Sequence, residues 1–147
     1  MSAPPITVHI ADDTFVAAAP HLVAAAVHDP RRWARWWPDL EVTSTRDRGL
    51  KGHQWLVGGD LQGTAEIWLE PWRDGTVLHL FLRLDFASER GDRQARREHD
   101  RRVLAWKRDA RALKDELEAG RAPGEPAVGG SIAGSIDGSI TGTDMPT

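Results

Sequence analysis

The chain has 147 residues, of which 40% are hydrophobic and 28% are charged, and its formal net charge is -3; this length suits a single domain, and so weak a charge gives no strong attraction to nucleic acid or to an anionic membrane surface. The absence of cysteine excludes disulfide bonds and thiolate metal sites. Because the N-terminus lacks a signal-peptide pattern and no apolar stretch reaches membrane-spanning length, we expect a cytoplasmic protein without stable membrane insertion.

The chain is predicted to begin with a strand and a short buried helix. Ile6 to Ile10 alternates apolar and polar residues, as a half-buried strand does, and Thr14 to Ala18 is expected to continue it beyond a kink at Asp12–Asp13. Pro20 to Val27 is predicted to be an apolar helix, because a proline at the first helical position has no N–H that needs a partner.

A second short helix carries the densest group of tryptophans in a chain with seven Trp and no Tyr. Asp29 is predicted to cap this helix and Pro30 to begin it. Because adjacent helical residues point a quarter-turn or more apart, we expect Trp33 and only one of Trp36 and Trp37 to face inward. The sequence leaves open whether these indoles seal the core or form the portal of a ligand cavity.

Four strand candidates follow and form a predicted antiparallel meander. They are Glu41 to Arg46, Gly52 to Val57, Gly63 to Glu70 and Thr76 to Phe86. One face of the last strand consists of Leu78, Leu80, Leu82, Leu84 and Phe86. We expect this strongly apolar face to cover the core.

Asp74–Gly75 is a strong hairpin signal, and we take these two residues as the centre of a tight turn. The cross-strand pairs that this register predicts are Arg73–Thr76, Glu70–His79, Trp68–Phe81, Glu66–Arg83, Leu69–Leu80 and Ile67–Leu82. A similar turn at Gly59–Asp60 would bring His53 beside Glu66. The resulting polar cluster of His53, Glu66 and Arg83 is interpreted as a surface ion pair in preference to an acid/base site.

A long helix is predicted from Asp92 to Ala119. Its apolar seam consists of His99, Val103, Trp106, Ala110, Leu113 and Leu117. The arginines Arg93, Arg96, Arg97, Arg101 and Arg102 alternate with acidic residues. A solvated helix face is therefore favoured over a nucleic-acid surface.

The last part of the sequence has a different composition. From Gly130 it repeats a four-residue Gly-Ser-Ile pattern, and its isolated isoleucines bury too little surface to offset the ordering of the chain. The predicted organisation is one folded domain over residues 1–121 and a flexible tail over residues 122–147.

The apolar sheet face and the helix seam must pack on each other. The predicted fold class is therefore α+β, with a curved antiparallel sheet wrapped around a long C-terminal helix and two short helices after the first strand. Five segments of the chain match the pattern of a known protein group. They are Val8–Pro38 with Asp29-Pro30 and Trp36-Trp37-Pro38, Arg48–Gly52 with Trp55, Glu66–Pro71, Asp74-Gly75 and Lys114–Glu118. Because these segments occur in the same order over residues 5 to 121, the chain resembles START-like helix-grip proteins, and more narrowly the polyketide cyclase/dehydrase and lipid-transport group of actinobacteria.

The resemblance has one clear departure. A full helix-grip meander has six strands after the short helices, whereas four can be placed here, or five if the stretch from Leu61 is bent. A smaller sheet implies a smaller cavity.

The leading functional interpretation is a cavity between sheet and C-terminal helix that binds a small hydrophobic molecule, either a lipid or a polyketide-like compound. The candidate cavity residues are Trp33, Trp36, Trp37, Leu78, Leu80, Leu82, His99, Val103 and Trp106. One alternative is an enzyme of the polyketide cyclase/dehydratase type, with His99 as the inward-facing acid/base candidate. Another is a protein-interaction or homodimerisation module that uses Trp68 and Phe81 on the outer face.

No cofactor is predicted. No metal site is predicted either, because the six histidines are scattered without ligand-like spacing to one another or to a carboxylate.

Overall fold

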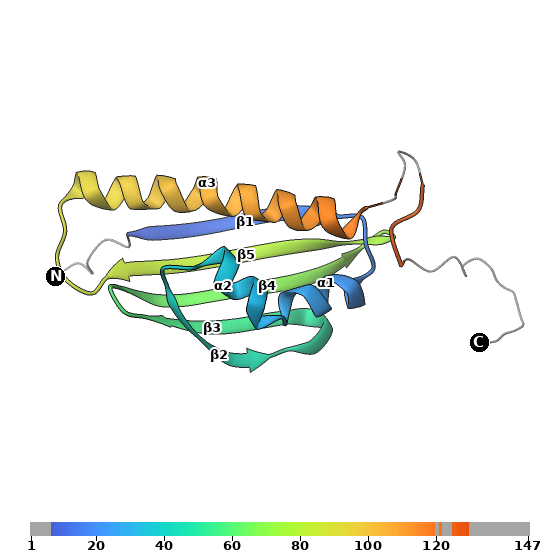
Figure 1. The fold of residues 1–147 in the computed structure, drawn as a ribbon, viewed down its shortest axis with the longest axis horizontal. Coiled ribbons are helices and arrows are strands. Elements are labelled where there is room, and N and C mark those ends of the chain that lie inside the picture. Colours follow the sequence, from blue (N-terminus) through green and yellow to red (C-terminus); the bar gives the residue numbers. More distant parts are fainter. Residues whose placement is uncertain (1–6, 120, 122–124, 130–147) are drawn as a thin grey trace, which may run out of the picture.

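The computed structural model describes residues 7–119, 121 and 125–129, which form three α-helices, one 3-10 turn and five strands (Figure 1). In chain order the elements are β1 (Val8–Val16), α1 (Pro20–Val27), α2 (Pro30–Trp36), β2 (Glu41–Asp47), η1 (Gly49–Lys51), β3 (Gly52–Gly58), β4 (Leu61–Trp72), β5 (Gly75–Phe86) and α3 (Asp92–Leu117). The strands form one antiparallel sheet in the order β1-β5-β4-β3-β2. None of these helices has both the length and the apolar content needed to cross a bilayer.

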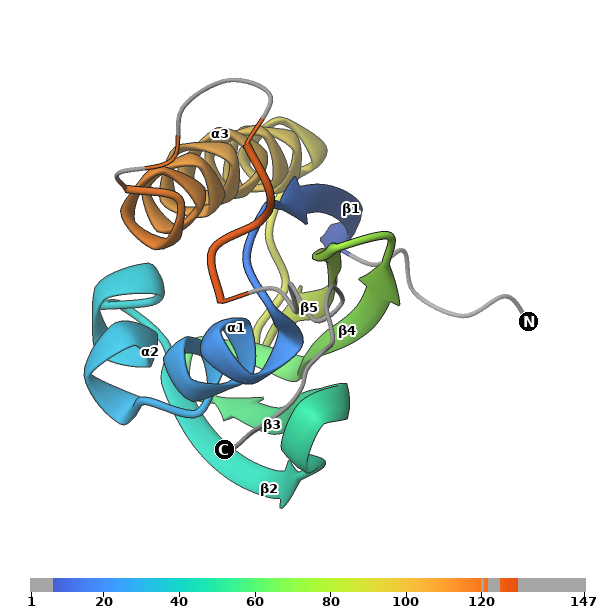
Figure 2. The same ribbon diagram turned by 90° about the vertical axis from the view of Figure 1, so that its right-hand side faces the viewer.

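The sheet curves around a core that helices cover on one side. Figures 1 and 2 show α3 running along β1, while α1 and α2 lie over the half of the sheet formed by β3 and β4. The leucines predicted to share one face of β5 are buried: Leu78, Leu80, Leu82 and Leu84. The predicted helix-grip α+β fold is confirmed, with four strands after the short helices.

The first strand is continuous, so the predicted kink at Asp12–Asp13 is wrong. β1 pairs with β5 without interruption from Val8 to Val16. Both aspartates have partners on their own faces of the sheet: Lys107 of α3 lies 3.2 Å from Asp12, and His79 lies 2.6 Å from Asp13. Because these side chains are satisfied in place, the strand does not need to break.

The β4–β5 hairpin turns one residue earlier than predicted, which moves every cross-strand partner by two residues. Trp72 pairs with Gly75, so that Arg73 and Asp74 are the central turn residues, and Arg73 has the positive φ of 55° that favours a tight hairpin turn. The observed opposite pairs are Glu70–Val77, Leu69–Leu78, Trp68–His79, Ile67–Leu80 and Glu66–Phe81. Since the shift is even, every residue keeps its predicted face.

Gly75 belongs to the strand because β1 passes close to it. A Cβ atom at this position would lie 2.6 Å from the Val16 carbonyl oxygen and 2.7 Å from the Phe15 ring. Only glycine leaves room for this approach. Tertiary packing against β1 therefore overrides the local Asp-Gly turn signal.

Part of the segment expected to be flexible packs on the domain. Val128 forms a parallel bridge with Ala18 and exchanges backbone hydrogen bonds with Ala17 and Ala19, at 2.8 and 2.7 Å. The amide of Ala127 donates to Asp74 at 2.9 Å. Residues 125–129 thus contact the body of the fold. The remainder of the predicted tail, 122–124 and 130–147, lies outside the described residues, and the boundary at 121 stays a prediction.

Candidate functional site

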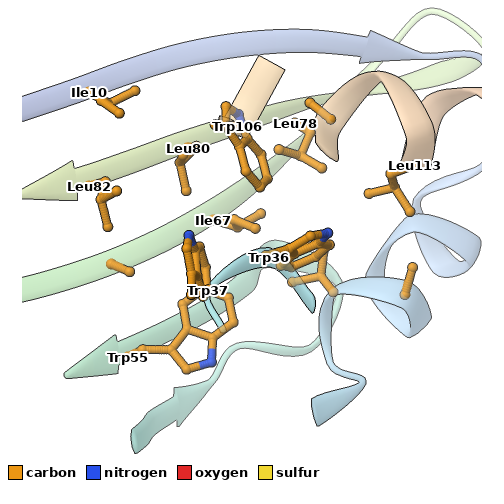
Figure 3. Packing of buried hydrophobic residues seen from close by; sticks show 14 of the residues in the cluster. Ile10, Trp36, Trp37, Trp55, Ile67, Leu78, Leu80, Leu82, Trp106 and Leu113 are labelled. Atoms are coloured by element: carbon orange, nitrogen blue, oxygen red, sulfur yellow. The ribbon is translucent and has the colours of Figure 1, made fainter. Parts of the chain in front are cut away.

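Tryptophans fill the space between the sheet and α3. Trp36 at the end of α2 and Trp37 directly after it meet Trp106 from α3 and Trp55 from β3 (Figure 3). Ring centroids lie 5.6 Å apart for Trp36 and Trp106, and 5.2 Å apart for Trp37 and Trp55, both edge to face. This geometry is favourable for indoles. The tryptophan-rich segment therefore packs within the core.

Trp36 and Trp37 are both buried, which contradicts the expectation that only one of them faces inward with Trp33. Helix α2 ends at Trp36, and Trp37 has φ -133° and ψ 64° outside the helix. This change in backbone direction turns the second indole to the same side as the first. Trp33 is half-buried, and its Nε1–H donates to the Val27 carbonyl at 2.6 Å.

Two of the buried indoles have unsatisfied N–H groups. Nε1 of Trp55 and Nε1 of Trp106 have no hydrogen-bond partner among the described residues, although these side chains are 1% and 3% exposed. An unpaired buried N–H destabilises a fold by about 1–3 kcal/mol. The core therefore contains two donors available to an acceptor.

Arg102 covers the edge of this core beside α2. It is buried and pairs with Glu98 at 2.7 Å and with Asp39 at 2.6 Å. The expectation that Arg102 lies on a solvated helix face is wrong, because the long side chain packs its stem inward while its head meets two carboxylates. Burial tends to raise the pKa of Asp39, but the hydrogen bond and charge of Arg102, with Arg101, hold that pKa below its usual range.

A cleft of about 850 Å³ opens between the end of β5 and the first two turns of α3. Its lining includes Thr7, Phe86, Arg90, Ala95, Arg96 and His99. In Figure 1 this is the end of the molecule where the yellow loop leads into α3, beyond the reach of α1 and α2. The Arg90 guanidinium lies 4.9 Å over the Phe86 ring and pairs with Asp60 at 3.1 Å. The loop and the strand end are thus held together at the cleft wall.

The predicted cavity residues separate into two groups. His99 lies at the cleft, half-exposed, with Nδ1 3.4 Å from the Asp100 carboxylate. The others that are buried pack in the core: Trp36, Trp37, Leu78, Leu80, Leu82 and Trp106. Trp33 and Val103 pack against that core from its edge. Contact of any of these residues with a ligand stays a prediction.

The predicted cluster of His53, Glu66 and Arg83 does not form. Gln54 occupies the position opposite Glu66, which places His53 on the other face of β3, where it is buried. Glu66 instead accepts hydrogen bonds from Arg48 at 3.2 Å and Gln54 at 3.1 Å. A one-residue error in the β3–β4 register is enough to exchange the faces.

His53 belongs to a histidine pair at the rim of the core that sequence reasoning missed. Its Nδ1 lies 2.7 Å from Nδ1 of His28, and its Nε2 lies 2.6 Å from the Ser44 hydroxyl. The His28 Nε2 lies 2.7 Å from the Gly49 carbonyl and 3.4 Å from the Asp47 carboxylate. Burial, followed by the charge of His28, lowers the pKa of His53. No local motif links residues 25 positions apart.

Similarity to known proteins is found in the three-dimensional structure and not in the sequence. No family model matches the sequence, and no curated protein does. The solved dimer of Aha1 from Colwellia psychrerythraea is similar to 78% of this chain and 99% of its own, at 18% identity and TM-score 0.56.

Two further solved structures are similar at lower TM-scores. The di-domain ARO/CYC StfQ of the steffimycin biosynthetic pathway aligns with 74% of this chain and 51% of its own, at 16% identity and TM-score 0.43. A polyketide-cyclase-like protein from Corynebacterium glutamicum aligns with 81% of this chain and 98% of its own, at 20% identity and TM-score 0.44. With the curved sheet and the long C-terminal helix already described, the similarity to the Aha1 structure establishes that the chain has the START-like helix-grip fold.

Proposed function

We propose that this protein binds a small hydrophobic molecule, a lipid or a polyketide-like compound, in the cleft between the end of β5 and the first two turns of α3. The observation that supports this most is the cleft itself. Its volume of about 850 Å³ lies within the range usual for small-molecule sites. It also lies between sheet and C-terminal helix, and of the nine residues that the sequence predicts for a cavity there, His99 lines it.

The cleft lining is mixed, with the carboxylates of Asp85, Glu89 and Asp92 beside its apolar surface, and we expect a ligand with an apolar body and a polar end. Phe86 and Ala95 offer apolar surface, and Arg96 has no ion-pair partner among the described residues. No tryptophan lines the cleft, and the buried indoles fill the space between sheet and α3 farther along the helix. We therefore expect a ligand to enter from the open end of the sheet and to stay at the start of α3.

The test is a screen of fatty acids and aromatic polyketides by thermal shift and tryptophan fluorescence. We expect saturable binding that Ala95→Phe weakens at least tenfold, because the added ring occupies the cleft. Ala112→Phe, on an exposed position of the same helix, is the matched control and should bind as the wild type does. Absence of saturable binding in both assays, or equal binding by the Ala95→Phe variant, contradicts the proposal.

The enzyme alternative requires a positioned acid/base pair in the cleft. His99 and Asp100 are the neighbouring candidates, at 3.4 Å. Proton transfer requires a distance of about 2.6–3.2 Å in the reacting complex. A His99→Gln variant that still binds ligand but loses turnover would favour the enzyme; binding with no turnover by the wild type would favour the binding protein.

A second candidate function is homodimerisation through the outer face of the sheet. Phe15, Trp68 and Phe81 are 37% to 40% exposed there, and Trp68 stacks on His79 at 4.5 Å. Exposed aromatic surface of this kind suits an interface. The similar Aha1 structure is that of a dimer. Analytical ultracentrifugation should detect a dimer that Trp68→Glu dissociates; a monomer at high concentration argues against this function.

A further inference from the structure

The histidine pair at the rim has a hydrogen-bond pattern that requires a positive charge or a proton at its centre. The Gly49 carbonyl can only accept, so the His28 Nε2 beside it carries the hydrogen and donates. In the neutral ring the Nδ1 of His28 is then a bare lone pair. This lone pair faces Nδ1 of His53 at 2.7 Å. Two bare nitrogens at this distance would repel each other.

The outer nitrogens of both rings are already satisfied. The Ser44 hydroxyl beside the His53 Nε2 can either donate or accept, which permits both neutral tautomers of His53. When Ser44 accepts, both rings present their Nδ1 lone pairs to one point. Metal-bound histidines have this arrangement, because the second ring nitrogen donates to a carbonyl, carboxylate or hydroxyl that fixes the ring.

A carboxylate completes the group. Among the described residues, His28, Asp47 and His53 each offer one ligand atom, and these three atoms lie within 4.8 Å of one another. The Asp47 side chain is 63% exposed at the end of β2, where its Oδ1 accepts the Gly49 N–H at 2.8 Å and lies 3.4 Å from Nε2 of His28. Ligation together with the two Nδ1 atoms therefore requires this carboxylate to turn from its present contacts. We propose that His28 and His53 bind one divalent cation of the zinc class through their Nδ1 atoms, with Asp47 as the carboxylate ligand.

The donor set and the surroundings fit this class of metal. Two imidazoles and one carboxylate suit zinc, which also accepts a water as the fourth ligand. Zinc–nitrogen bonds of about 2.0–2.1 Å in a tetrahedral site would need the two nitrogens, now 2.7 Å apart, to separate by about 0.6–0.7 Å. His28 can supply this movement, because it lies at the C-terminal cap of α1 with its side chain 21% exposed. Trp33 and Trp55 lie 4.8 Å from the His53 ring and shield it.

A second histidine with two carboxylates provides the contrast. In His79, Nδ1 meets Asp13 at 2.6 Å and Nε2 meets Glu70 at 2.9 Å. These carboxylates lie at opposite nitrogens of one ring, so their ligand atoms do not converge on one point. His79 is therefore the matched control for an acid-flanked histidine that should not bind a metal.

The experiment is isothermal titration of the full chain with ZnCl₂ in a non-coordinating buffer. We expect one Zn²⁺ per chain for the wild type and for His79→Gln. We expect His28→Gln to weaken binding by roughly tenfold or more and Asp47→Asn to weaken it by less. Far-UV circular dichroism checks that each variant folds. Because His28 and Asp47 are both partly exposed to solvent, we expect their variants to fold, so that Zn²⁺ binding can be compared among folded proteins.

A structural readout accompanies the affinity. Nitrogen-15 NMR of the imidazoles should show Zn²⁺ converting His53 to the tautomer that carries its hydrogen on Nε2. The proposal is overturned if the wild type shows no saturable Zn²⁺ binding, if His28→Gln binds as tightly as the wild type, or if His79→Gln removes binding. An imidazole nitrogen-15 spectrum of His53 that does not change when Zn²⁺ is added also overturns the proposal, because His28 and His53 then share only a proton.

Discussion

Trp55→Phe and Trp106→Phe should change stability little, although both indoles are at the centre of the core. Each substitution removes about two buried carbon atoms, a loss of about 1.6 kcal/mol at about 0.8 kcal/mol per methylene-sized group. Each also removes an N–H that is buried without a partner, which relieves about 1–3 kcal/mol. The two effects oppose each other, so we expect each variant to lie within about 1 kcal/mol of the wild type.

Trp33→Phe should be more destabilising despite its greater exposure. Its half-buried ring loses roughly half the apolar contribution, about 0.8 kcal/mol. It also loses the hydrogen bond to the Val27 carbonyl, a net contribution of about 1 kcal/mol. The expected destabilisation is about 1–2 kcal/mol. Trp72→Phe, at an indole that is 50% exposed, is the control and should be near neutral.

Urea unfolding followed by far-UV circular dichroism measures these differences, with the transition midpoint and its slope recorded for each variant. Losses of more than about 3 kcal/mol in both Trp55→Phe and Trp106→Phe, with a neutral Trp33→Phe, would contradict these expectations. That order would mean that the two buried N–H groups have an acceptor in solution, such as a bound water or a ligand.

Three further predictions concern the edges of the fold. The folded-state pKa of Asp39 is held below its ordinary value of 3.8, so its contribution to stability is present above about pH 4 and is lost as pH falls through the folded-state pKa. Asp39→Asn should therefore flatten the acid limb of a stability-versus-pH curve, and an unchanged limb would contradict this. Gly75→Ala should destabilise the hairpin by about 1–3 kcal/mol because the added methyl meets the Val16 carbonyl; calorimetry that detects no loss would refute the β1 contact. Truncation after residue 121 should lower the melting temperature by a few degrees, since it removes the Val128 bridge, whereas an unchanged melting temperature would mean that the segment adds no stability.

The sequence predicted features that depend on local periodicity. The alternation of Thr76 to Phe86 identified the buried leucine face, and prolines at the first helical positions identified the starts of α1 and α2. The order of these elements also predicted the fold, because an apolar sheet face and a helix with one apolar seam have few ways to pack.

Features that depend on contacts between residues far apart in the chain could not be predicted from the sequence. The hairpin register follows from the approach of β1 to Gly75, which no turn rule contains. The inward position of Trp37 follows from a non-helical backbone at the end of α2. His28 and His53 meet only because α1 crosses the sheet above β3, and the sequence distance between them conceals the pair.

We propose that the cleft at the start of α3 binds a ligand while the tryptophan core stays closed. A nitrogen-15 HSQC titration with a ligand from the screen tests this directly, because backbone amides and indole N–H groups are observed together. We predict saturable shifts at Phe86, Ala95 and His99, with the indole signals of Trp36 and Trp106 unmoved. No shifts at the cleft, or shifts centred on those indoles, would contradict the account.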